Sequence, residues 1–152
     1  MDNISGFIAA EMIAIPDIAA IVINLQQSRA NIQLSSGFTP VKIPYQGTEL
    51  TGKFTPAIQN GLQTVDHSVS VRIPHYKITD ELNNYLNNFK VNGGVLLLSD
   101  TDNKVWVSGS LDAPLTLEYE NRIGDDQTSF RGYVLNFNAV LTHSILYYYP
   151  LQ

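Results

Sequence analysis

The chain has 152 residues, of which 44% are hydrophobic and only 15% are charged, and its net charge at neutral pH is −5. Its lysines and arginines form no cluster, which argues against sequence-independent DNA binding, because such binding needs several cations on one face. There is no cysteine, and this excludes disulfides, thiolate metal sites and cysteine nucleophiles.

The first predicted element is a strand from Gly6 to Ile15 that is apolar at almost every position. Glu11, Pro16 and Asp17 interrupt the apolar stretch, and no basic residue precedes it, so it resembles neither a transmembrane helix nor a secretory signal. Alternate side chains of a strand point to opposite faces, so this strand needs cover on both. A small domain has little to place on the second face, and we therefore expect a neighbouring copy to cover it.

This reasoning predicts an assembly strand at residues 6–15 that lies in an interface between copies of the chain. The predicted interface residues are Phe7, Ile8, Met12, Ile13 and, near the end of the chain, Tyr148. Tyr148 belongs to the run Tyr147–Tyr149, in which neighbouring side chains alternate, so at least one tyrosine must face water or a partner.

The next segment, Ile18 to Leu25, fits a strand or a helix, and its β-branched residues favour a strand. Short strands are expected at 32–34 and 41–43. Residues 45–60 contain two glycines and a proline, and they are interpreted as a loop or arm. Within them we expect a strand near 49–56, followed by a loop through Asn60-Gly61 that is a candidate for disorder or for a binding arm.

The pattern becomes clearer from Thr64, where apolar and polar residues alternate as far as Ile73, as in a half-buried antiparallel strand. A helix is predicted from Thr79 to about Phe89, with Leu82 and Leu86 on its apolar face. Thr79 can cap this helix, and the two acidic residues that follow suit the first turn.

A hairpin is predicted over Val95–Val107, and alternating strands follow around 115–120 and 133–141. Many strands with one amphipathic helix indicate a mainly β fold, an antiparallel sandwich or barrel with the helix at 79–89 laid on one side. We expect one β-rich domain covering residues 1–152.

Several residue groups are candidates for chemical sites. None of the three histidines is spaced as a metal-ligand pair, and His67 is most simply a core or interface residue. Asp100, Asp102 and Asn103 resemble the start of a calcium loop but lack its glycine and final glutamate, so a hairpin turn explains them better. Glu118 and Glu120 share a strand face, which is typical of a solvated strand. Neither a nucleophile elbow nor a phosphate loop is present, so the sequence predicts no enzyme and no cofactor.

Three segments together resemble small structural proteins of tailed bacteriophages and of prophages of Bacteroides-like bacteria. They are Val69–Pro74 before the helix, Gly94–Asp100 with Asn103 and Trp106–Gly109, and Pro114–Leu115 with Gly132–Phe137 and the aromatic end. The similarity covers about residues 50–149 and rests on structural motifs, with Arg131 where an aspartate is expected.

The resemblance implies a virion protein that forms a homo-oligomeric ring in the tail tube, neck or head–tail connector, assembled in the bacterial cytoplasm. The implied partners are further copies of the chain and other virion proteins. DNA would pass through the ring without sequence-specific binding, as an acidic balance allows, and no membrane is involved. The alternative is a β-sandwich binding module that recognises a receptor or a carbohydrate on a fibre or cell surface.

Overall fold

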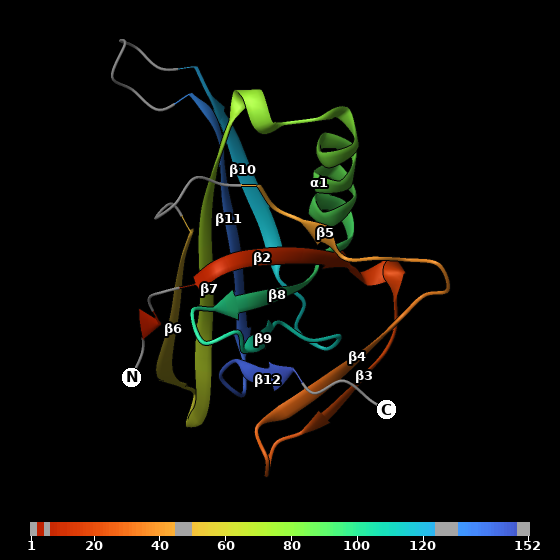
Figure 1. Ribbon diagram of the computed structural model, residues 1–152. Helices are drawn as coiled ribbons and strands as arrows, with labels where there is room; N and C mark the ends of the chain where they lie inside the picture. Colours follow the sequence, from red (N-terminus) through yellow and green to blue (C-terminus); the bar gives the residue numbers. More distant parts are fainter. Residues whose placement is uncertain (1–2, 5–6, 45–49, 124–130, 149–152) are drawn as a thin grey trace.

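The computed structural model describes residues 3–4, 7–44, 50–123 and 131–148, which form two β-sheets and one α-helix (Figure 1). The strands of one sheet run along the long axis in the figure, and most strands of the other cross them. The helix stands beside the upper half of the first sheet. This confirms the predicted class, a mainly β fold with a single flanking helix.

Sheet A is antiparallel throughout, and each of its long strands has one apolar face. Its order is β1 (Asn3–Ile4), β6 (Leu50–Gln59), β7 (Leu62–Pro74), β11 (Gly132–Leu141) and β10 (Thr116–Arg122). The alternation predicted from Thr64 to Ile73 is confirmed, because the side chains of Val65, His67, Val69, Val71 and Ile73 are all buried. Buried residues of β11 and β10 extend the same face.

Sheet B contains the predicted N-terminal strand and the predicted hairpin. Its order is β3 (Ile18–Asn24), β4 (Arg29–Leu34), β12 (Leu146–Tyr148), β9 (Val105–Ser108), β8 (Gly94–Asp100), β2 (Phe7–Ala14) and β5 (Val41–Lys42). Two short 3₁₀ turns, η1 (Ile15–Asp17) and η2 (His75–Lys77), follow β2 and β7. The segment from Ile18 is therefore a strand, as its β-branched residues predicted.

Helix α1 (Asp80–Asn92) begins where the sequence predicted, because the Thr79 hydroxyl accepts a hydrogen bond from the Leu82 amide at 3.1 Å. It continues one turn beyond the predicted end and stops at Gly93, whose φ of 73° suits a glycine. Its buried side chains are Leu82, Leu86 and Phe89, as expected.

A tyrosine fixes the position of α1 against sheet B. The Tyr85 hydroxyl donates to the Asp17 carboxylate at 2.8 Å and accepts from the Ala14 amide at 2.7 Å. Burial raises the pKa of this hydroxyl, so it remains a donor. The helix is thereby joined to the end of β2 and to η1.

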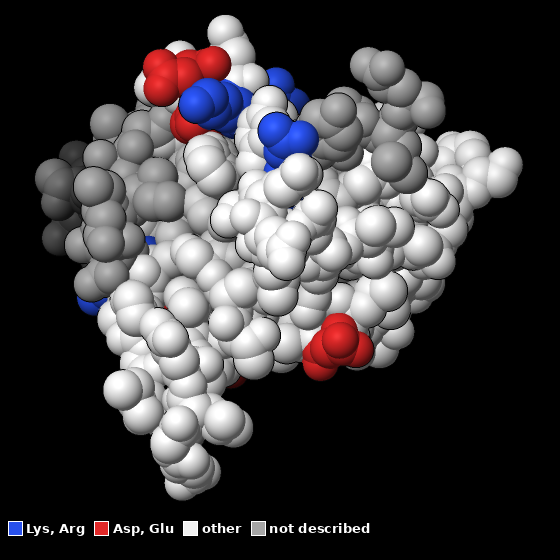
Figure 2. All heavy atoms as spheres, turned by 90° about the horizontal axis from the view of Figure 1, so that it is seen from below, with Lys and Arg blue, Asp and Glu red and all other residues white. Residues whose placement is uncertain are grey.

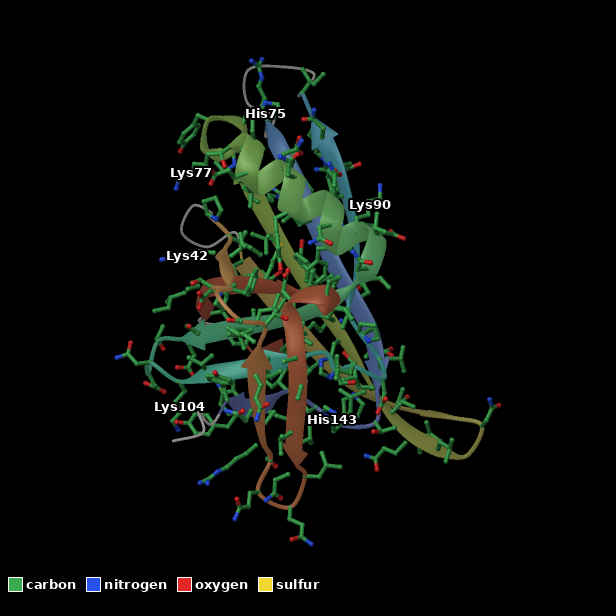
Figure 3. All side chains as sticks on the ribbon, turned by 90° about the vertical axis from the view of Figure 1, so that its right-hand side faces the viewer. Lys42, His75, Lys77, Lys90, Lys104 and His143 are labelled. Atoms are coloured by element: carbon green, nitrogen blue, oxygen red, sulfur yellow. The ribbon has the colours of Figure 1, made fainter. Side chains whose placement is uncertain are left out.

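Strand β2 is covered on both faces by its own chain, so the premise that a neighbouring copy must cover one face is wrong. Met12 belongs to the core between sheet A, α1 and sheet B. Ile13 points the other way into a second cluster, and both side chains are 0% exposed. Sheet B curls so that β3 and β4 pack over this second face, in front of the crossing strands in Figure 3. The cluster consists of Ile13, Ile18, Ala30, Ile32, Val95, Leu97, Val107 and Leu146.

The predicted loop or arm at 45–60 is mostly a strand. Residues 50–59 form β6, which pairs along its length with β7, while residues 45–49 lie outside the described ranges. Asn60 and Gly61 connect the two strands with φ angles of 53° and 79°, as a two-residue hairpin turn requires. The end of the β6–β7 hairpin projects from the body at the lower right of Figure 3.

Candidate functional site

The predicted interface residues lie in two different environments. Phe7, Met12 and Ile13 are buried in the chain's own core, so they are not available to another copy. Ile8 is 51% exposed, because the pairing of β2 with β8 shifts register between Phe7 and Ala9 and turns this side chain outward. Tyr148 is half-buried against the second apolar cluster. Ile8 is therefore the accessible apolar residue of the predicted assembly strand.

The end of the β6–β7 hairpin exposes two further aliphatic side chains that sequence reasoning missed. Ile58 is 78% exposed and Leu62 is 70% exposed. Ile58 pairs with Gln63 and Leu62 pairs with Gln59, so the two aliphatic side chains point to opposite faces of the hairpin. We call this segment, residues 58–62, the arm. The sequence placed a candidate binding arm in the loop through Asn60-Gly61, and the aliphatic residues on either side of that turn were the signal for the exposed side chains.

The end of the β3–β4 hairpin forms a second exposed apolar surface. Val22, Ile23 and Leu25 are all exposed there, beyond the part of the hairpin that packs on the second cluster. No charged residue occurs between Ile18 and Ser28. In the view of Figure 2, from the lower end of the molecule, white uncharged residues cover most of the surface and charged groups lie mainly toward its margins.

A buried histidine joins the two sheets. His67 on β7 lies 2.8 Å from the Ser108 hydroxyl through Nδ1 and 2.8 Å from the His143 carbonyl oxygen through Nε2. A carbonyl only accepts, so Nε2 carries the proton, and the serine hydroxyl donates to Nδ1. A serine hydrogen-bonded to a histidine is also the nucleophile–base pair that some hydrolases use. Here Ser108 is 0% exposed and the third partner is a carbonyl instead of a carboxylate, so the contact links sheets and does not present a nucleophile.

The histidine link should make stability depend on pH. Burial lowers the pKa of His67, whereas a histidine in the unfolded chain titrates near about 6.5. Below that pH the unfolded chain binds more protons, so the free energy of unfolding should fall as pH is lowered and should be fully retained above it. Urea unfolding measured between neutral pH and mildly acidic pH should show this decrease.

The control for this prediction is a second histidine. His67→Gln should remove most of the pH dependence, while the same change at the exposed His75 should leave it unchanged. An unchanged slope in the His67→Gln variant would show that another group causes the acid sensitivity.

The acidic turn is held together by its own carboxylate. Asp100 accepts from the amides of Asp102 and Lys104 at 2.8 and 3.0 Å, and from the Trp106 indole at 2.9 Å. These hydrogen bonds, the indole bond first, lower the pKa of Asp100. The predicted hairpin turn is confirmed. In the part of the chain that the structure describes, no three potential metal ligands come together.

The outer face of sheet A carries a shallow hollow of about 900 Å³ that is lined by both apolar and polar side chains. Its polar side chains are those of Lys53, Thr55, Asp66, Ser68, Thr116 and Asn138. Glu118 and Glu120 are exposed on β10 of the same sheet, and Glu120 pairs with Arg122. They lie on a solvated strand face, as the sequence indicated.

Comparison of the chain with protein-family models, with curated proteins and with solved structures finds no match in any of the three. Within the described ranges, no helix has the length and apolar character needed to cross a membrane. The functional proposal therefore rests on the chain's own surfaces and on the resemblance of its segments.

Proposed function

We propose that this chain is a structural virion protein of a tailed phage, which assembles into a closed ring in the tail tube, neck or head–tail connector. The observation that carries the proposal is the arm, which lies at the projecting end of the β6–β7 hairpin in Figure 3. Its Ile58 and Leu62 have most of their surface in water. Aliphatic side chains that stay in water do not stabilise a monomer. Contact with a neighbouring subunit would bury their apolar surface and so stabilise an assembly.

The geometry of the arm suits insertion into a neighbour. Because Ile58 and Leu62 point to opposite faces, contact with one flat surface would leave one of them in water. A cleft or a pair of neighbouring surfaces would cover both. Contact between the arm of one copy and a different surface on the next, such as the exposed Ile8 region, is head-to-tail, and such contacts form a ring when the rotation from copy to copy closes.

The resemblance supports the same proposal. Its segments coincide with β7, with the β8–β9 hairpin and with β11, which form the framework of the two sheets. A mainly β domain with one flanking helix is the architecture that the resemblance implies. Low charge and an acidic balance suit a protein that meets its own copies and other virion proteins and lets DNA pass.

The placement of four of the nine basic residues also fits a ring through which DNA passes without being held by its phosphates. Lys42, Lys77, Lys90 and Lys104 come from β5, η2, α1 and the β8–β9 turn, and Figure 3 shows Lys90 and Lys104 well away from the other two. Phosphate binding needs several cations along one surface.

Electron microscopy of the purified protein at high concentration tests the proposal. We expect closed rings for the unmodified chain and their loss in the double variant Ile58→Asp, Leu62→Asp, which should stay folded because both side chains are exposed. Val91→Asp, at another exposed aliphatic position on α1, is the matched control and should keep the rings. A field of single subunits for the unmodified chain would contradict the proposal.

The hollow on sheet A favours a second candidate, a binding module for a receptor or a carbohydrate. Its threonine, serine, asparagine and aspartate side chains offer the hydrogen-bonding groups that hydroxyl-rich ligands need. Titration of the protein with oligosaccharides, with Asp66→Ala as the comparison, tests this candidate. Saturable binding that is lost in the variant would favour it over the ring.

A further inference from the structure

The described edges of the two sheets differ in how well they are protected against pairing with another strand. On β6, beyond the two residues that pair with β1, Pro56 supplies no N–H group. Strand β10 carries Glu118, Glu120 and Arg122, and charged side chains discourage edge pairing. Strand β5 has only two residues, one of them Lys42.

Strand β3 has little of this protection. It is seven residues long, contains neither a charged residue nor a proline, and forms one end of sheet B. Its pairing with β4 shifts register between Ile18 and Ala20, so the regular part of the strand runs from Ala20 to Asn24. An uncharged apolar strand of this kind is a template for a further strand.

We propose that the free edge of β3 pairs with the β3 strand of a second copy, antiparallel and about a two-fold axis at Val22. The partner must also offer an unprotected edge, and among the strands at the ends of the two sheets β3 is the long one that carries no charged residue. An antiparallel pair of identical strands about a two-fold axis is self-complementary. If a residue of one copy faces a second residue of the other copy, that second residue in the first copy faces the first residue in the other. Val22 is the centre of the regular segment from Ala20 to Asn24.

The side chains of β3 suit this pairing. Val22 is 52% exposed, and Ile23 and Leu25 are exposed beside it, so a second strand would cover apolar surface as well as join backbone groups. No like charges meet across the axis, because the segment carries none. The contact is separate from the arm, so pairing through β3 and ring formation can each fail without the other.

Sedimentation analysis tests the pairing in the Ile58→Asp, Leu62→Asp background, where contacts through the arm are removed. We expect this protein to be a dimer and to become monomeric when either Val22→Lys or Val22→Glu is added. With the two-fold axis at this position, residue 22 of one copy lies opposite residue 22 of the other, only about 5 Å away, so two identical charges there repel each other.

Mixing the two Val22 variants in equal amounts should restore the dimer, because opposite charges then face each other across the axis. Val140→Lys, a matched change at an exposed valine on the outer face of sheet A, should leave the dimer intact. Circular dichroism should show the same folded spectrum for every variant. A monomer before any change at Val22, or a mixture that stays monomeric, would overturn the proposal.

Discussion

Replacing Phe89 with alanine should lower the free energy of unfolding by about 3–5 kcal/mol, as for other large buried side chains. The Phe89 ring is fully buried, and it packs edge-to-face on Phe137 of β11 with 5.3 Å between ring centroids. The change removes both the buried apolar area and the contact that fastens α1 to sheet A. Urea unfolding followed by circular dichroism measures the loss.

The matched control lies on the same helix. Val91 is 82% exposed, so Val91→Ala should change the free energy of unfolding by no more than about 0.5 kcal/mol. A loss below about 1 kcal/mol for Phe89→Ala would mean that this face of α1 is not part of the core.

Aspartate at position 12 should unfold the protein, while aspartate at position 8 should not. Met12 is fully enclosed by the main core, so a carboxylate there would be buried without a partner and should cost more than about 4 kcal/mol. Ile8 is half in water, so Ile8→Asp should leave the fold intact. Thermal melts of the two single variants, side by side, measure the difference.

The two single variants, Met12→Asp and Ile8→Asp, also distinguish a position in the core from a position in an interface between copies. Equal, small effects at both positions would show that β2 is less enclosed than the packing of Met12 indicates. A folded Ile8→Asp variant that no longer assembles would place Ile8 in a contact between copies, and one that still assembles would exclude it.

The elements with a regular pattern could be predicted from sequence. The alternation in β7 and β11, and the spacing of Leu82, Leu86 and Phe89 on α1, report directly which face is apolar. Capping by Thr79 and the turn at Asp100 were also predictable, because both depend on hydrogen bonds between near neighbours in the chain.

The cover of β2 could not be predicted in the same way. An apolar strand shows that both faces are buried, but not whether the covering residues come from the same chain. Here the curl of sheet B brings β3 and β4 over Ile13, and this depends on pairing β4 with β12, more than a hundred residues later in the chain. The outward turn of Ile8 likewise depends on a bulge, for which Phe7 and Ala9 give no local signal.

The candidate surfaces were only partly predictable. An arm near 45–60 was expected, but its projecting end is the Ile58–Leu62 turn, which follows from the long register of β6 with β7. The contact of His67 with Ser108 and with the His143 carbonyl joins residues from three distant segments, so its partners appear only in the folded chain.

The mass of the purified, unmodified protein in solution, measured by light scattering over a wide concentration range, tests self-assembly most directly. The proposal predicts one closed species whose mass is a fixed multiple, greater than two, of the 16.9 kDa chain. A mass of twice the chain would support pairing through β3 but contradict the ring. A mass equal to that of the single chain at the highest concentration would contradict both.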